Sequence, residues 1–186
     1  MGGMKLSATP LAGMYEIRTS PFSDARGRFT RLFCEQALAP IRPNLHFTQI
    51  NLSETRGIGT VRGLHYQIPP VGEAKMVRCV RGCIFDVAVD LRADSPTFLH
   101  WHALELAGDN DKAVFIPEGF AHGFQTLTEE ADVLYLHTAP WTPAYERGLR
   151  HDDPRLSIAW PKPAMNLSGR DRGYAPIDAT FAGLRT

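Results

Sequence analysis

The clearest strand in this chain is Ile84-Phe85-Asp86-Val87-Ala88-Val89-Asp90-Leu91. Large apolar side chains occupy its odd-numbered positions, whereas Asp86, Ala88 and Asp90 lie between them. Successive side chains of a strand point to opposite faces, so this alternation predicts one apolar face and one small or acidic face. The stretch therefore indicates a β fold and predicts which side chains face its core.

Similar short apolar segments lie on both sides of this strand. Directly before it, residues 75–80 predict a partner strand, with Arg81-Gly82 as the turn. Further strands are expected at residues 29–33, 47–52, 98–106, 113–116, 123–127 and 133–138. Only residues 35–38 predict a helical turn, because Pro40 and Pro43 stop it.

Turn residues are spread along the whole chain, which has 14 prolines and 16 glycines. Many short strands joined by tight turns predict an all-β double-sheet jelly roll or similar barrel with short helical turns. We expect one domain over residues 1–186, in which residues 152–186 form an irregular tail that wraps the surface. Residues 1–4 are interpreted as a remnant of cloning. Such a barrel holds a small ligand in its mouth or interior.

Composition excludes several classes of protein. Twenty basic residues balance 20 acidic ones, so no global field attracts nucleic acid or an anionic membrane surface. No apolar run approaches the roughly 20 residues that span a bilayer, and the first residues lack the apolar stretch of a signal peptide. Cys34, Cys79 and Cys83 form no disulfide framework, which favours a reducing compartment, and we expect a cytoplasmic protein.

One candidate for chemistry is Arg62-Gly63-Leu64-His65-Tyr66-Gln67. If this stretch is extended, His65 lies on one strand face, and Lys75 opens the next strand. A histidine titrates near neutral pH and can accept a proton from carbon. A partly buried lysine can hold the negative oxygen that forms when a carbon next to a ketone is deprotonated. The alternative is a structural His65 and an exposed Lys75.

A second candidate is Pro117-Glu118-Gly119-Phe120-Ala121-His122. This PxGxxH turn in a β-barrel is similar to one half of the cupin metal motif, whose other half needs HxH. Gln67 stands where the second histidine is required, and an amide oxygen is a poor ligand for zinc, iron or manganese. His100 and His102 are two residues apart but far in sequence from the turn, so we interpret both as surface or structural residues. The sequence therefore predicts no metal site.

The remaining candidates are aromatic and basic. Tyr135 lies among apolar residues on an expected buried strand, and its hydroxyl is a candidate general acid, although most such tyrosines are core residues. Trp141 offers a flat face for a nucleobase or simply caps the surface. Arg26 or Arg28, in a glycine turn, can bind a pyrophosphate bidentately or form a solvated hairpin turn.

Taken together and in this order, these elements resemble the dTDP-4-dehydrorhamnose 3,5-epimerase family. The resemblance covers about residues 15 to 175. The matching stretches are Asp24–Phe29, Gln49–Asn51, Arg62–Gln67, Lys75, Asp86–Arg92, Ile116–Phe124, Tyr135, Glu146, Asp153-Pro154, Trp160-Pro161 and Leu167–Asp171. The resemblance implies a cupin-type jelly roll, or double-stranded β-helix, that forms a strand-exchanging homodimer and uses no metal or organic cofactor. It also implies a nucleotide-linked 4-keto-6-deoxysugar substrate.

The resemblance also implies roles for individual residues. His65 corresponds to the base that removes the C3 and C5 protons, Asp171 to the carboxylate that orients it, and Tyr135 to the acid on the opposite face. Lys75 corresponds to the residue beside the C4 oxygen, and His122 is expected in the same cavity, held by Asp86. The residues expected to bind the nucleotide diphosphate are Arg26, Gln49, Asn51, Arg62, Glu146 and Arg170.

Three positions depart from the family pattern as the resemblance gives it. Arg31 stands where a glutamate is common, Leu136 where a lysine often follows the acid tyrosine, and Trp141 where a second tyrosine is usual. Trp141 retains an aromatic face, whereas Arg31 reverses a charge near the nucleotide. The alternatives to a 3,5-epimerase are a 3- or 5-monoepimerase, a 3,4-ketoisomerase, a metal-dependent cupin and a catalytically silent sugar-binding barrel.

Overall fold

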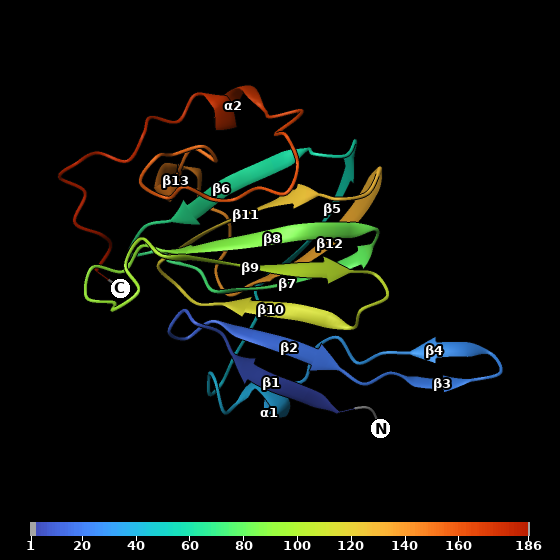
Figure 1. Ribbon diagram of the computed structural model, residues 1–186. Coiled ribbons are helices and arrows are strands. Elements are labelled where there is room, and N and C mark those ends of the chain that lie inside the picture. The colour runs from blue at the N-terminus through green and yellow to red at the C-terminus, as the bar shows by residue number, and fades with distance from the viewer. Residues whose placement is uncertain (1–2, 186) are drawn as a thin grey trace.

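The computed structural model describes residues 3–185 and consists mainly of two antiparallel sheets (Figure 1). Across the six-stranded sheet the order is β1 (Met4–Ala8), β2 (Tyr15–Thr19), β10 (Lys112–Ile116), β7 (Lys75–Arg81), β12 (Glu130–His137) and β5 (Gln49–Arg56). Across the five-stranded sheet it is β13 (Glu146–Gly148), β6 (Val61–Gln67), β11 (Phe120–Thr126), β8 (Cys83–Asp90) and β9 (Trp101–Ala107). The predicted all-β jelly roll is confirmed.

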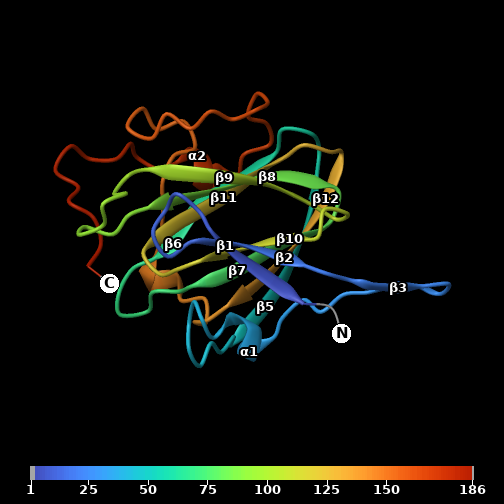
Figure 2. The same ribbon diagram turned by 60° about the horizontal axis from the view of Figure 1, so that its bottom comes forward.

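Five short elements among residues 3–185 lie outside these two sheets. β3 (Phe22–Asp24) and β4 (Gly27–Phe29) form a hairpin that projects away from the barrel in both views (Figures 1 and 2). The helical elements are α1 (Glu35–Leu38), the 3-10 helix η1 (Pro143–Tyr145) and α2 (Gly169–Arg172). Within residues 3–185, no helix is long and apolar enough to cross a membrane.

Strand β8, which contains most of the alternating stretch 84–91, is buried on both faces. Its Ala88 side packs in the core between the two sheets, with Val77 of β7 and Phe124 of β11. Its Val87 and Val89 side packs beneath the C-terminal segment. The predicted alternation is correct, and both faces are covered because residues 149–184 supply apolar side chains to the outside of the five-stranded sheet.

The connection from β7 to β8 corrects one prediction. Residues 75–80 do form a strand and Gly82 does form the turn, with φ of +73°. However, β7 pairs with β10 and β12, whereas β8 pairs with β11 and β9. The expectation that β7 is the partner strand of β8 is therefore wrong, because the turn at Gly82 carries the chain from one sheet to the other.

Other boundaries also differ from the sequence expectations. β9 begins at Trp101, because residues 97–100 form a turn in which Leu99 has φ of +61°. Of residues 29–33, only Phe29 belongs to a strand. Met4 begins β1, while Met1 and Gly2 lie outside the described residues, so the interpretation of residues 1–4 remains a prediction.

The irregular C-terminal segment lies over the five-stranded sheet, on the side opposite the second sheet (Figure 2). Leu156, Ile158 and Ile177 are at most 9 % exposed and belong to the apolar cluster there. Burying apolar side chains of this size stabilises by roughly 1.5–3 kcal/mol each. The segment is therefore held in place firmly enough to present α2 to the neighbouring strand β6.

Candidate active site

A cavity of about 860 Å³ opens between the two sheets. Strands of both sheets and the segment around α2 contribute to its lining. It is lined by Gln49, Asn51, Leu52, Ser53, Thr60, Arg62, His65, Glu73, Lys75, His122, Tyr135, His137, Trp141, Glu146, Asn166, Ser168, Arg170 and Asp171. A volume in this range suits a small organic ligand.

On the side of the five-stranded sheet, His65 of β6 is paired with a carboxylate from the C-terminal segment. Its Nε2 lies 2.7 Å from Oδ1 of Asp171, whose side chain is only 4 % exposed. Burial raises the pKa of Asp171, but the hydrogen bond and charge of His65 outweigh burial and lower it overall. The ionised carboxylate accepts the Nε2 proton, so the neutral imidazole carries its lone pair on Nδ1 and can act as a base.

Local geometry explains how this pair meets. Gly63 has φ of +122°, and a Cβ there would lie 2.6 Å from the Cα of Gly123, so β6 and β11 approach each other closely. His65 and His122 are direct partners across these two strands. Asp171, the partner of His65, lies in α2, where the Ser168 hydroxyl accepts a hydrogen bond from the Asp171 amide and caps the helix.

Arg170 connects the same imidazole to the mouth of the cavity. Its Nη2 lies 3.1 Å from Nε2 of His65, and its Nη1 donates to Glu146 Oε2 at 2.7 Å. The Arg170 side chain is about half exposed, whereas Glu146 is largely buried. An arginine that is held by Glu146 and is half exposed can bind an anionic group at the cavity mouth.

On the side of the six-stranded sheet, Tyr135 of β12 contacts two imidazoles. Its ring meets the His122 ring edge-on, with centroids 5.9 Å apart, and stacks on His137 with centroids 5.8 Å apart. Burial raises the pKa of Tyr135. Its phenol therefore stays protonated at neutral pH and can serve as a proton donor.

His122 is in turn held by Asp86 of β8. Its Nε2 lies 2.8 Å from Asp86 Oδ2, and both side chains are almost fully buried. The second oxygen of this carboxylate, Oδ1, is buried without a hydrogen-bond partner among residues 3–185. The expectation that Asp86 holds His122 in the same cavity agrees with this geometry.

Lys75 is also buried and lies beside a carboxylate that the sequence reasoning missed. Its Nζ lies 2.9 Å from Glu73 Oε1, and Glu73 Oε2 lies 2.9 Å from Nδ1 of His137. Burial raises the pKa of Glu73, but the positive charge of Lys75 and hydrogen bonds from His137 and Lys75 lower it to about 2. The carboxylate is therefore ionised and joins a lysine to a histidine.

The residues expected to bind the nucleotide line the cavity as well, with one exception. Gln49 accepts a hydrogen bond from the backbone amide of Trp141 at 3.1 Å, and Asn51 Nδ2 lies 3.4 Å from His137 Nε2. Arg62 donates to Thr55 at 3.0 Å. Trp141 is 57 % exposed, so its indole lies at the cavity mouth, where a base can stack on it.

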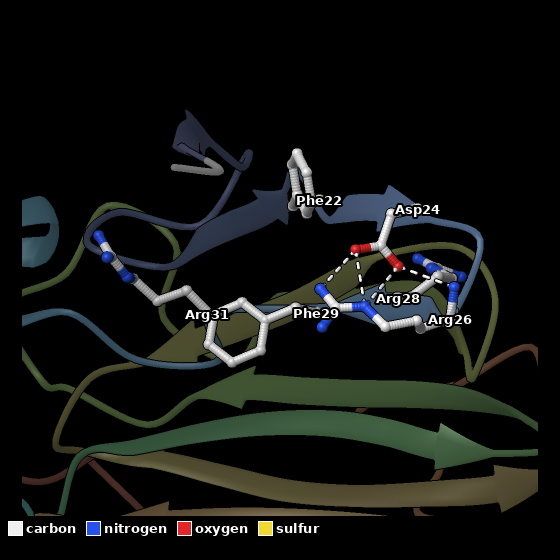
Figure 3. Close-up of a pocket in the computed structure, with 7 residues that line it drawn as sticks. Phe22, Asp24, Arg26, Arg28, Phe29 and Arg31 are labelled. Carbon is white, nitrogen blue, oxygen red and sulfur yellow. Dashed lines mark hydrogen bonds and ion pairs between the residues drawn. The ribbon is translucent and has the colours of Figure 1, made fainter.

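The exception is Arg26, which lies outside this cavity. It is at the turn of the β3–β4 hairpin, is 89 % exposed and pairs with Asp24 at 2.7 Å. Figure 3 shows it with Phe22, Phe29 and Arg31 in a separate pocket of about 590 Å³. Within one chain, the structure does not bring Arg26 to the other predicted site residues.

Two of the three departures from the family pattern also avoid the cavity. Arg31 belongs to the hairpin pocket. Leu136 is 5 % exposed and packs in the apolar cluster on the outer face of the six-stranded sheet. Leucine at position 136 therefore leaves the chemistry of the cavity unchanged, whereas Trp141 lies on its rim.

The candidate metal ligands serve other partners. Gln67 donates to the carbonyl oxygens of Val71 and Pro140 and accepts from the Thr142 amide, so it braces a loop. His100 and His102 do not line the cavity. Among residues 3–185, no group of three or more His, Cys, Asp or Glu side chains is placed to hold a metal ion.

Several lining residues were not predicted: Leu52, Ser53, Thr60, Glu73, His137, Asn166 and Ser168. Strand alternation could have found two of them. His137 follows Tyr135 by two residues and Glu73 precedes Lys75 by two, so each lies near the same face as a residue already chosen. Asn166 and Ser168 reach the cavity through the irregular segment, for which no periodic signal exists.

Comparison with known proteins identifies relatives of this chain. A sequence of Sinorhizobium fredii (strain NBRC 101917 / NGR234), a dTDP-4-dehydrorhamnose 3,5-epimerase, is 42 % identical over 167 residues, covering 87 % of this chain and 86 % of the relative. A dTDP-4-dehydrorhamnose 3-epimerase of Streptomyces niveus is 40 % identical over 185 residues, covering 97 % and 88 %.

A solved structure of the same kind of enzyme is also similar to this chain. The 3,5-epimerase of Legionella pneumophila Philadelphia 1, in complex with dTDP-4-keto-L-rhamnose, superposes with a TM-score of 0.91 at 34 % identity and covers 98 % of each chain. The profile of the dTDP-4-dehydrorhamnose 3,5-epimerase family matches residues 8–178. This chain therefore belongs to the dTDP-4-dehydrorhamnose 3,5-epimerase family.

Proposed function

We propose that this protein epimerises a dTDP-linked 4-keto-6-deoxyhexose at the carbons next to the ketone, in the synthesis of a rhamnose-like deoxysugar. The single observation that supports this most is the pairing of His65 with Tyr135. A carboxylate-bound imidazole and a protonated phenol line one cavity from opposite sheets. Inversion of a carbon centre needs a base on one face and an acid on the other.

The reaction follows from the acidity of carbons beside a ketone. His65 takes the proton from C3 or C5, and Asp171 stabilises the imidazolium that forms. The electron pair moves onto the C4 oxygen, where the Lys75 ammonium stabilises the enolate. Tyr135 then donates its proton to the opposite face of the same carbon. The C–H bond broken on one face is replaced by a new C–H bond on the other, His65 ends with the proton taken and Tyr135 without the proton given, and neither oxidant nor reductant is consumed.

The nucleotide part of the substrate is assigned to the cavity mouth. Arg62 and Arg170 supply positive charge for the diphosphate, while Gln49, Asn51 and Glu146 supply hydrogen bonds. Trp141 stacks on the thymine. These positions surround the catalytic pair, so the anionic end is anchored while the sugar ring lies between His65 and Tyr135.

We also propose a homodimer in which the β3–β4 hairpin of one protomer reaches the cavity of its partner. Phe22 and Phe29 on this hairpin are 59 % and 74 % exposed, and Ile50 and Leu52 on edge strand β5 are 63 % and 57 % exposed. Large apolar side chains gathered on a projecting hairpin and on an unpaired edge are typical of an interface. This arrangement would deliver Arg26 to the diphosphate of the neighbouring site.

The second candidate function is a 3-monoepimerase. The Streptomyces niveus relative with this activity is 40 % identical, close to the 42 % of the 3,5-epimerase from Sinorhizobium fredii. Both activities use the same base and acid. They differ in whether C5 as well as C3 is presented to His65. We place either reaction in the cytoplasm, which agrees with the free thiols of Cys34, Cys79 and Cys83.

One incubation separates these functions. Wild-type protein is mixed with dTDP-4-keto-6-deoxyglucose in D₂O, and the sugar is followed by NMR. We expect deuterium at C3 and C5, with inverted configuration and the ketone still at C4. Deuterium and inversion at C3 alone would identify the monoepimerase, and a ketone moved to C3 a ketoisomerase. A sugar that remains fully protonated would refute both epimerase assignments.

A further inference from the structure

Glu73 brings a negative charge to the place where the proposed reaction needs a positive one. Its carboxylate lies 2.9 Å from the Lys75 ammonium, in a side chain that is 11 % exposed. Lys75 itself is 6 % exposed. A carboxylate this close weakens the field that an ammonium offers to an enolate, so its presence needs a chemical reason.

The reason lies in the cost of burying a lysine. Burial favours the neutral amine, and an unpaired lysine in such a place loses its proton at much lower pH than one in water. A carboxylate within hydrogen-bond distance opposes this effect. An amine without its proton cannot stabilise the enolate, so the carboxylate that weakens the field also preserves the charge.

His137 holds this carboxylate from the other side. Its Nδ1 lies 2.9 Å from Glu73 Oε2, and it is the direct cross-strand partner of Lys75. Its ring also stacks on Tyr135. One imidazole thus contacts both the carboxylate and the proposed acid, and its position follows from strand register alone.

The surroundings of Lys75 offer no other close carboxylate. On β10 its partner is the apolar Ile116, and on β12 it is His137. The ion pair to Glu73 is the only one of Lys75 within residues 3–185. The other titratable or charged groups that line the cavity are Arg62, His65, His122, Tyr135, Glu146, Arg170 and Asp171.

We propose that Glu73 and His137 are positioning residues: Glu73 keeps the buried Lys75 charged and aimed into the cavity, and His137 holds Glu73 in place. This deepens the proposed function, because the held ammonium is the group that stabilises the enolate. Neither residue exchanges a proton with the sugar. Their effect is on the pH range over which Lys75 works.

The first test measures Lys75 directly and needs no substrate. The sequence has four lysines, Lys5, Lys75, Lys112 and Lys162, so ¹³C-lysine labelling gives a simple spectrum. Lys75 is assigned from the signal lost in Lys75→Arg. In Glu73→Gln we expect its ammonium to lose the proton about 1–2 pH units lower than in the wild type. The matched control is Glu130→Gln, an exposed carboxylate on β12 that pairs with Arg81.

The role of His137 is tested with two replacements of different chemistry. His137→Gln keeps an N–H donor for Glu73, whereas His137→Leu removes it. We expect the lysine titration of the glutamine variant to stay close to wild type and that of the leucine variant to move in the same direction as Glu73→Gln. Equal titrations in wild type, Glu73→Gln and His137→Leu would overturn the proposal.

Kinetics then connect the titration to turnover. In Glu73→Gln the alkaline limb of the kcat profile should move to lower pH by the same amount as the Lys75 titration, with KM for the dTDP-sugar changed less than about twofold. A uniform loss of kcat at every pH, without movement of the limb, would indicate a purely structural role and reject the proposal. If the wild type shows no epimerase activity, the proposed function fails while the lysine titration still decides the role of Glu73.

Discussion

The two sides of the cavity present their catalytic groups in different ways. On the six-stranded sheet, Lys75, Tyr135 and His137 are neighbours by strand register, and Glu73 lies two residues before the start of β7. On the five-stranded sheet, His65 lies on a strand, but its partner Asp171 comes from α2 in an irregular segment 106 residues away. The side of the cavity that carries the proposed acid Tyr135, here called the acid side, is therefore built by one sheet. The side that carries the proposed base His65, here called the base side, depends on a long segment that folds back over the other sheet.

The two sides of the cavity are also stabilised by different contacts. Sheet register allows neighbouring side chains only a few arrangements, so the acid side is determined once β12 pairs with β7 and β5. The base side depends on apolar contacts of Leu156, Ile158 and Ile177 with the sheet and on the Ser168 cap of α2. Variants on the two sides should consequently fail in different ways.

The largest effect is expected from removing the base. His65→Ala should lower the rate of proton exchange at C3 and C5 by about 10³–10⁴-fold, because in the proposed reaction His65 is the group that takes these protons. Deuterium uptake from D₂O measures it. His102→Ala, a histidine outside the cavity, is the control, and a thermal unfolding midpoint within a few degrees of wild type verifies the fold. Near-normal exchange in His65→Ala would remove His65 from its role.

Removing the acid should separate exchange from inversion. Tyr135→Phe keeps the aromatic ring between His122 and His137 but lacks the hydroxyl, so inversion should fall by about 10²–10³-fold. Deuterium exchange with retention should persist, since His65 can return a deuteron to the face from which it took the proton. The ratio of exchanged to inverted sugar is the measurement. Equal losses of exchange and inversion would contradict separate roles for the two sides.

Unfolding at low pH tests the carboxylate of Glu73, which lies on the side of the cavity that carries Tyr135. The pKa of Glu73 lies at about 2 in the fold against its ordinary value of 4.5, so its ionisation stabilises the fold above about pH 4.5. That stabilisation, on the order of 3 kcal/mol, is lost as the pH falls from about 4.5 towards 2. Urea unfolding at fixed protein concentration should show wild type and Glu73→Gln converging over this range. Glu130→Gln should differ from wild type by a small and constant amount, and a constant gap for Glu73→Gln would contradict the pairing.

A smaller effect is expected from the partner of the base. Asp171→Asn keeps the shape of the side chain but no longer stabilises the imidazolium, so kcat should fall by about 10–10²-fold. The pKa of Asp171 is lowered in the fold, so the carboxylate is ionised wherever His65 is a neutral base. The acid limb of kcat/KM should therefore move to lower pH in the variant, because a cation without its carboxylate partner loses its proton more readily. An unchanged limb would show that Asp171 does not act through His65.

The smallest effect is expected at the hairpin. Arg26→Ala should raise KM by about 3–10-fold and leave kcat nearly unchanged, because the arginine binds the diphosphate and not the reacting carbons. Mixed dimers test where it acts. When Arg26→Ala protomers are recombined with His65→Ala protomers, one site regains both groups, and a wild-type KM should return. Persistent high KM in the mixture would show that Arg26 does not serve the partner's site.

Most of the site was predictable residue by residue, but its pairings were only partly so. Lys75, His122 and Tyr135 are on strands that alternation identified, and all three line the cavity as expected. Arg26 is the clearest difference, because a motif gives its position in sequence and not the direction in which a hairpin projects. Glu73 and His137 were missed although each lies two residues from a chosen residue, because alternation predicts a strand face and not the contacts that a side chain makes there.

The β class and the alternation at residues 84–91 could be read from the sequence, because side-chain period and turn chemistry are local properties of the chain. Most of the residues that line the cavity were identified through the resemblance to the family. The tertiary structure alone decided that β7 and β8 belong to different sheets and that Glu73 joins Lys75 to His137. Strand pairing and the contacts of the C-terminal segment depend on which apolar faces bury each other. That choice is made by the whole chain, and no short stretch of sequence contains it.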